Sequence, residues 1–204
     1  MVAMRAIALT LLTAAALVLG CTDSSGPGGV PTSQLNFVRQ DTLAPPLLAT
    51  RDSFWAKVDD GRELSLYYQG ATPSDSGEEF VRLEVPGDGL LRRPDGSGFQ
   101  VDDSILITIT VVDPDRFIFQ FEPAGLVFSA EHPARLKIRY PNAQHDFDGD
   151  GDQDGDDDSI ERALGLWYQR VPAERWVRVG FVKFEELDEI AANIFSFSQY
   201  AVAW

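Results

Sequence analysis

Short runs in which apolar and polar side chains alternate recur along most of this 204-residue chain, and they constrain its fold more than any other feature. Because the side chains of a strand point alternately to the two faces of a sheet, this period predicts strands with one buried face. Turn residues such as Gly, Pro and Asp separate the runs. We predict an all-β fold, an antiparallel sandwich of about nine or ten strands. The runs lie at 62–69, 81–85, 105–111, 117–121, 135–140, 163–169, 175–182, 192–198 and 199–204.

One segment, 184–192, favours a helix instead, because Leu187, Ile190 and Ala191 fall on one side of a helical turn. Apolar residues make up 44% of the chain, enough for a proper core. We therefore predict a single domain over 34–204, with 34–52 as an extended lead-in to the first strand.

Residues 1–20 have the pattern of an export signal: a short basic segment ends at Arg5, and an apolar run over 6–19 follows. That run is too short to span a membrane stably, and either Met1 or Met4 could be the start. The segment ends in Val-Leu-Gly-Cys21, which resembles the lipobox of bacterial lipoproteins. In that family the peptide is cut before the cysteine, which is then acylated. An ordinary secretory peptide with an incidental cysteine is the alternative.

Cys21 is the only cysteine in the chain, so it has no disulfide partner. The lipobox resemblance implies that acyl chains on Cys21 anchor an exported protein to the cell envelope. Thr22 stands where the inner-membrane retention signal of enteric bacteria has Asp, so the outer membrane is the expected location in a cell that has one. Residues 21–33 are rich in Gly, Ser and Pro and predict a flexible linker.

Residues 146–158 contain eight Asp and three Gly. Carboxylates so close repel one another, whereas a hard cation such as Ca²⁺, which takes six to eight oxygen ligands, would reverse the sign of that energy. The register D-x-D-x-D-G-x-x-D-x-x-D from Asp146 resembles the thrombospondin type-three calcium repeat. The register from Asp150 matches the EF-hand loop. The candidate calcium ligands are Asp146, Asp148, Asp150, Asp152, Asp154, Asp157, Asp158 and Glu161.

The flanking strands at 135–140 and 163–169 place this acidic stretch in a loop between strands, whereas an EF-hand needs a helix on each side. We therefore favour a lone structural calcium loop of the repeat type. The alternative is a solvated acidic linker without a bound ion.

The formal net charge of −15 argues against nucleic acid or anionic lipid as a partner, because both need clustered Lys and Arg. Eight of the 32 acidic residues lie in the Asp-rich stretch. The other 24 stand against 17 basic residues, so the remainder of the chain is only mildly acidic.

The segment 121–140 contains Pro123-x-Gly125-x-x-Phe128, followed by Pro-x-x-Leu-x-Ile-x-Tyr ending at Tyr140. It resembles the strand–turn–strand core of the ZU-five domain, found in zonula occludens proteins, Unc-five netrin receptors, ankyrins and bacterial surface proteins. The stretches 85–96, 166–176 and 197–202 resemble other parts of that domain in the same order. The resemblance covers about residues 80–204, without the Asp-rich insert. It implies a sandwich used for protein contacts, so we expect a protein partner.

Some ZU-five relatives cut themselves within a His-Phe-Ser motif, where the Ser attacks its own preceding peptide bond. The matching residues here are Ser196, Phe197 and Ser198. Ser196 replaces the His, so the base that would activate Ser198 is missing. We expect neither self-cleavage nor another enzymatic activity.

The chain has only two His, His132 and His145, and it lacks the usual hydrolase, zinc-protease and phosphate-loop motifs. His145 directly precedes the acidic stretch, but a neutral imidazole is a poor calcium ligand. The alternative function is a surface hydrolase or carbohydrate-binding module that uses exposed carboxylates and tryptophans, although Trp in a sandwich is more often core. The four tryptophans are Trp55, Trp167, Trp176 and Trp204.

Overall fold

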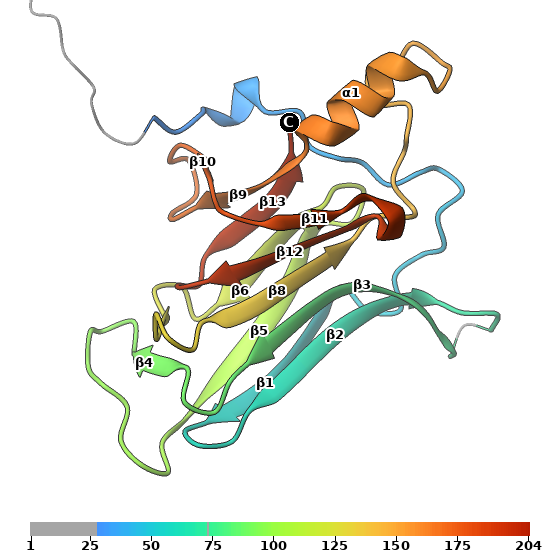
Figure 1. Ribbon diagram of the computed structural model, residues 1–204. Helices are drawn as coiled ribbons and strands as arrows, with labels where there is room; N and C mark the ends of the chain where they lie inside the picture. Colours follow the sequence, from blue (N-terminus) through green and yellow to red (C-terminus); the bar gives the residue numbers. More distant parts are fainter. Residues whose placement is uncertain (1–27, 73) are drawn as a thin grey trace, which may run out of the picture.

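A computed structural model describes residues 28–72 and 74–204, and they form the predicted all-β antiparallel sandwich (Figure 1). One sheet has six strands in the order β1-β5-β6-β13-β9-β10, and the other has five in the order β11-β12-β8-β3-β2. A separate two-stranded sheet pairs β4 with β7. The strands are β1 (Arg51–Lys57), β2 (Arg62–Gln69), β3 (Ser76–Val85), β4 (Leu90–Arg92), β5 (Ser104–Asp113), β6 (Ile118–Glu122), β7 (Val127–Phe128), β8 (Ala134–Arg139), β9 (Gly165–Gln169), β10 (Val177–Arg178), β11 (Val182–Phe184), β12 (Glu189–Ile194) and β13 (Gln199–Ala203).

The strands beyond the nine or ten that were predicted are mostly short, and they lie where the sequence shows little alternation of apolar and polar residues. β1 follows the lead-in and pairs with β5 from Arg51↔Thr110 to Lys57↔Ser104. The run predicted over 175–182 is divided, because β10 pairs with β9 in one sheet and β11 pairs with β12 in the other. This segment therefore crosses between the two layers of the sandwich.

The predicted helix over 184–192 is wrong. A single 3-10 turn covers Glu185–Leu187, and β12 then pairs with β8 along its whole length. Ile190 and Ile194 are buried on the inner face of the sheet, whereas Leu187 is exposed. Pairing with β8 therefore decided the conformation, and the weak helical spacing did not.

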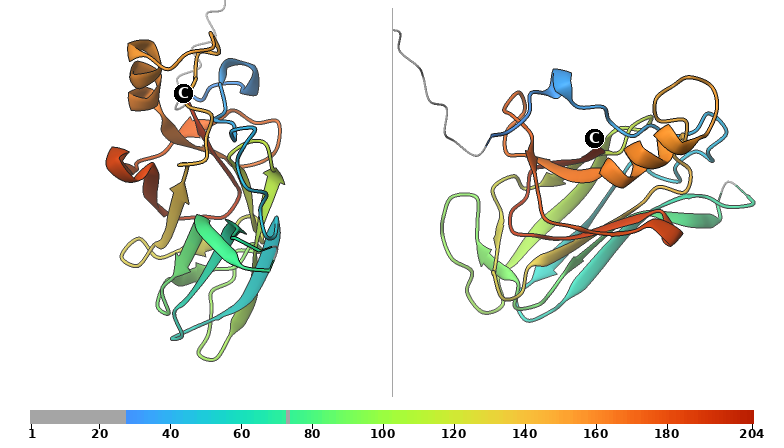
Figure 2. Two further views of the ribbon diagram at one scale, coloured as in Figure 1. Left: turned by 90° about the vertical axis from the view of Figure 1, so that its right-hand side faces the viewer. Right: turned by 45° about the horizontal axis from the view of Figure 1, so that its top comes forward.

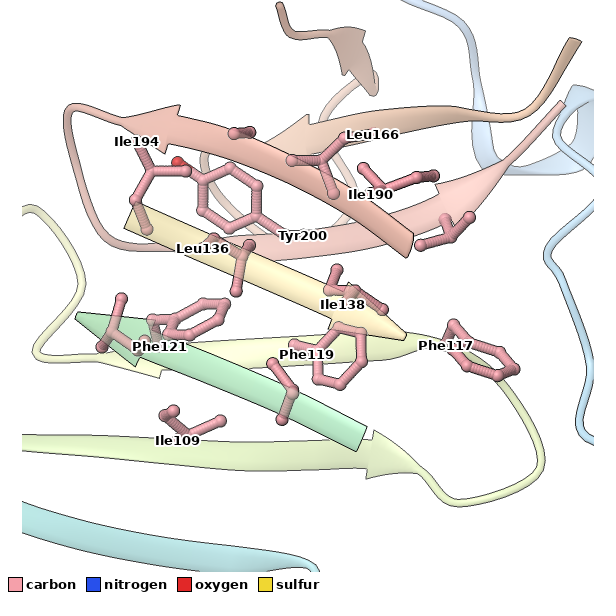
Figure 3. Packing of buried hydrophobic residues seen from close by; sticks show 14 of the residues in the cluster. Ile109, Phe117, Phe119, Phe121, Leu136, Ile138, Leu166, Ile190, Ile194 and Tyr200 are labelled. Carbon is pink, nitrogen blue, oxygen red and sulfur yellow. The ribbon is translucent and has the colours of Figure 1, made fainter. Parts of the chain in front are cut away.

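Aromatic and branched side chains from both sheets fill the space between the layers (Figure 3). Phe119 and Phe121 of β6 face Leu136 and Ile138 of β8, and all four are buried. Alternation along β6 and β8 explains this core directly, because every second residue of each strand points inward.

The N-terminal segment covers the outer face of the six-stranded sheet at the end where α1 (Gly155–Ala163) and the C-terminus also lie (Figure 2). Leu35 packs in one cluster with Trp176 and Ala203, and the N–H of Val38 donates to the carbonyl of Val202 at 3.0 Å. As a result β13 is buried on both faces, and the C-terminal strand is held inside the fold.

Candidate metal-binding loop

The Asp-rich stretch, 146–158, follows β8 in the chain. Its first part is a loop, and its last part begins the helix α1. The prediction that this stretch is entirely a loop between strands is therefore wrong for its last part. Asp157 supplies the local reason, because its side chain accepts from the N–H of Asp154 and completes a capping box with the Asp154 side chain. Carboxylates in the first turn also complement the positive end of the helix dipole.

Cations from distant strands stabilise the other end of α1. Arg178 donates to the carbonyls of Ala163 and Leu164 at 3.1 and 3.2 Å, and the ammonium of Lys183 donates to the carbonyl of Glu161. A helix end leaves its last carbonyls without partners inside the helix, and the Glu161 carbonyl here also accepts from the N–H of Leu164 at 3.1 Å. Because the cations lie 14 to 22 residues further along the chain, the local sequence of α1 did not reveal them.

Phe147 anchors the loop to the body of the protein. Its side chain is 9% exposed and joins the main core, with its ring centroid 5.6 Å from that of Trp204 and 5.7 Å from that of His145. One apolar residue among the acidic ones therefore connects the loop to the C-terminal end of the chain.

Five carboxylates gather in two overlapping groups that could hold a metal ion. The first group is Asp146, Asp148 and Asp157, and the second is Asp152, Asp154 and Asp157, with the ligand oxygens of each group within 4.8 Å of one another. Asp157 is buried and belongs to both groups. It is therefore the centre of the candidate site.

The backbone of the loop fits the register that begins at Asp146. In that register Gly151 takes the sixth position, where a calcium loop turns sharply, and its φ of 102° favours glycine. The N–H groups of Gly149 and Gly151 donate to the two carboxylate oxygens of Asp146 at 2.8 and 3.1 Å. Asp157 is then the twelfth residue.

The register from Asp150 fits less well, because its sixth residue, Gly155, already begins α1. Its twelfth residue, Glu161, lies on the helix and accepts a hydrogen bond from the Tyr140 hydroxyl at 3.2 Å. Asp150 accepts from the N–H of Asp152, and Asp158 is an exposed residue of the first helical turn. None of these three predicted ligands, Asp150, Asp158 or Glu161, belongs to either carboxylate group.

Crowding of charge and donation by the backbone act in opposite directions on the carboxyl pKa values. The charge of Asp150, followed by some loss of hydration, raises the pKa of Asp152. The Asp150 N–H lowers the pKa of Asp148, but burial and the neighbouring charges outweigh it, so this pKa is raised as well. For Asp157, burial raises the pKa, but donation from the N–H groups of Asp154, Phe147 and Asp148 outweighs it, so the pKa of Asp157 is lowered.

Both serines of the self-cleavage comparison contact other groups in the fold. Ser198 is buried, and its hydroxyl donates toward the carbonyls of Gln169 and Arg170. The hydroxyl of Ser196 is 3.3 Å from that of Tyr168. The imidazole of His132 is 3.2 Å from a carboxylate oxygen of Asp88.

The tryptophans are mostly part of the packing. Trp176 is 2% exposed and donates to the Thr32 hydroxyl at 3.1 Å, while Trp167 is half-buried and donates to the Ala203 carbonyl at 3.0 Å. Trp204 packs on Phe147. Only Trp55, at 59% exposure, is open to solvent.

Comparison of the chain with protein-family models, with curated proteins and with solved structures found no significant match. The similarity to ZU-five domains therefore stays a prediction. Cys21 and the predicted export signal lie outside the described residues. Within 28–72 and 74–204, the helices are all too short or too polar to cross a membrane.

Proposed function

We propose that this protein is a non-enzymatic lipoprotein of the cell envelope, whose β-sandwich makes protein contacts and whose acidic loop binds one structural Ca²⁺ ion. The observation that carries the calcium part is the pair of carboxylate groups that share Asp157. The lipobox ending at Cys21 supports the anchor, and the sandwich with its ZU-five-like segments supports the role in protein contacts.

Calcium suits this loop better than a transition metal. The donors are carboxylate oxygens without cysteine, and a set of hard oxygen ligands is typical of Ca²⁺. Asp146, Asp148, Asp152 and Asp154 are exposed or only partly buried. We expect weak affinity, with a Kd on the order of 10⁻⁴–10⁻³ M, which suits a structural ion outside the cell.

The alternative, a surface hydrolase or carbohydrate-binding module, receives less support from the tryptophans. A sugar platform needs exposed aromatic faces, and three of the four tryptophans are packed in the fold. Trp55 lies opposite Leu106 on the edge strand β1. A single exposed ring is a small platform for a sugar.

Calcium titration of the chelator-treated full chain, by calorimetry and by thermal melting, tests the loop. At 10 mM Ca²⁺ a site of this affinity should raise the free energy of unfolding by about 1.4–2.7 kcal/mol, or the Tm by about 3–10 °C for a domain of this size. Asp146→Asn with Asp148→Asn should abolish the shift. The exposed pair Asp52→Asn with Asp75→Asn serves as the matched control.

The register adds a sharper expectation: Asp158→Asn and Glu161→Gln should leave calcium binding unchanged. The absence of both heat and a Tm shift would make the loop an acidic linker. For the anchor, cell fractionation should find the protein in membranes, and Cys21→Ser should release it. An unchanged distribution of the Cys21→Ser protein would remove the lipoprotein part of the proposal.

A further inference from the structure

The strand β12 has a complete neighbour on one side and an incomplete one on the other (Figure 1). All of Glu189–Ile194 pairs with β8, but β11 pairs only with Glu189, Ile190 and Ala191. Within the described chain, the last three residues of β12, 192–194, therefore have no strand on the β11 side. We call 192–194 the open edge.

A cavity of about 840 Å³ lies along the open edge, and all three of its residues line it. This volume is within the range of sites that bind small molecules or short peptide segments. The segment that connects β10 to β11 forms another wall, with Val179 and Phe181 in the lining. The cavity thus lies where β11 would continue if it were longer.

Aromatic side chains make the cavity largely apolar. Tyr168 and Tyr200 line its inner part, and Phe181 and Phe195 line other parts of the wall. Phe195 is 50% exposed, although a large apolar side chain is usually covered in a folded domain. Apolar surface around an unpaired strand edge is typical of an interaction site.

The polar part of the lining is mainly basic, in a chain whose net charge is −15. It contains Arg82, Arg135 and Lys137 but only one carboxylate, that of Glu84. Arg82 and Lys137 each lie 2.7 Å from the buried carboxylate of Glu79. They therefore already have a close partner.

Arg135 differs from these two cations. Its nearest carboxylate, Glu84, is 3.6 Å away, and its side chain is 67% exposed. An exposed ion pair at this distance is weak. The guanidinium of Arg135 is therefore available to a carboxylate from outside.

We propose that an extended segment of a partner protein adds as a strand to the open edge, with apolar side chains in the cavity and an acidic residue against Arg135. Backbone hydrogen bonds to the open edge would supply affinity, and the aromatic wall and Arg135 would supply selectivity. The inference rests on the proposed role in protein contacts, and it names the site and the chemistry of the partner.

An eight-residue synthetic peptide of alternating valine and threonine with an aspartate at each end serves as the probe, titrated into the full chain by NMR or calorimetry. We expect saturable binding that Arg135→Glu weakens by about fivefold or more. Arg51→Glu is the matched control, because Arg51 is 65% exposed and 3.7 Å from its carboxylate partner Glu122, but lies in the other sheet. It should bind the peptide as the unchanged protein does.

A second peptide with an N-methyl group on every residue tests strand addition, because it has no backbone N–H donor on either edge. The proposal is overturned if this peptide binds equally well, if neither peptide binds at millimolar concentration, or if lysine replaces the terminal aspartates without loss. Binding of the fatty acid laurate, with neither peptide bound, would assign the cavity to an amphiphile. Dimers that form with rising concentration, and that the Phe195→Asp substitution removes, would assign the open edge to a second copy of this chain.

The calcium melt and the membrane fractionation do not involve the open edge. If the peptide does not bind but the calcium melt and the membrane fractionation give their expected results, only the strand-addition site is removed. If the calcium melt and the membrane fractionation both fail while the peptide binds, the calcium and lipoprotein parts of the proposed function are removed instead.

Discussion

Truncation of Phe147 to alanine should destabilise the whole sandwich, and not only the acidic loop. Phe147 is the apolar anchor of this loop, 9% exposed and packed on Trp204. Phe→Ala changes in protein cores cost about 3–5 kcal/mol. Because Phe147 lies at the margin of the core and has a half-buried neighbour in His145, we expect the lower end, about 3 kcal/mol.

Urea unfolding of the full chain in chelator measures this loss, and thermal melting should show a Tm lower by about 6–12 °C. Intrinsic fluorescence provides a local readout, because Trp204 loses its aromatic neighbour. Phe195→Ala is the matched control, since its side chain is 50% exposed, and we expect a loss of less than about 1 kcal/mol.

The same substitution should weaken calcium binding. The N–H of Phe147 donates to Asp157 at 2.6 Å, so the anchor holds the shared ligand of both carboxylate groups. Without the ring, the loop must be ordered when the ion binds, and that entropy opposes binding. Equal stability of Phe147→Ala and the unchanged protein would refute the reasoning, since the loop would then be independent of the core.

Two other predictions concern charge and chemistry. In chelator, the contribution of Asp148 and Asp152 to stability should fall as the pH rises above about 4, the ordinary aspartate value, because their folded-state pKa values are raised and the folded state binds protons more tightly there. Asp157 has a lowered pKa and acts with the opposite sign, its contribution being lost as the pH falls through that pKa. Urea unfolding from pH 4 to 8 should therefore show that Asp148→Asn with Asp152→Asn loses less stability with rising pH than the unchanged protein does, and the same pH dependence in both would contradict the charge argument. The chain should also run as a single band on a denaturing gel after prolonged incubation, because Ser196 stands where the self-cleaving motif has its His; fragments split before Ser198, and lost in Ser198→Ala, would prove this wrong.

The positions of strands were predictable where burial of one face alone sets the alternation of apolar and polar residues. β2 has the predicted bounds, and β5 and β8 differ by only one or two residues. The prediction failed where pairing partners decide the structure, as for β12, which adopts a strand because β8 lies beside it. The division of 175–182 between two sheets also depends on tertiary contacts that no local pattern contains.

The candidate site was predictable in composition but not in geometry. Eight aspartates with interspersed glycines indicated a metal loop, and both register patterns occur in the sequence, with only the predicted flanking strands favouring the repeat type. The turn at Gly151 and the start of α1 at Gly155 separate the two registers. The open edge had no sequence signal, since it exists only because β11 begins at Val182, opposite Ala191, and leaves the end of β12 uncovered.

The distribution of backbone donors explains how such an acidic loop can hold a defined shape before an ion binds. Asp146, Asp148, Asp150 and Asp154 each accept from an N–H two to five residues further along, so much of their charge faces a local donor. Asp157 accepts three backbone bonds as well, from the N–H groups of Phe147, Asp148 and Asp154, which all precede it. Hydrogen bonds to an ionised acceptor are about twice as strong as neutral ones, and they offset part of the repulsion between carboxylates. The raised pKa values of Asp148 and Asp152 show that the offset is incomplete. A cation that relieves the remaining repulsion in a loop already shaped by Phe147 and α1 would therefore bind without first ordering the chain.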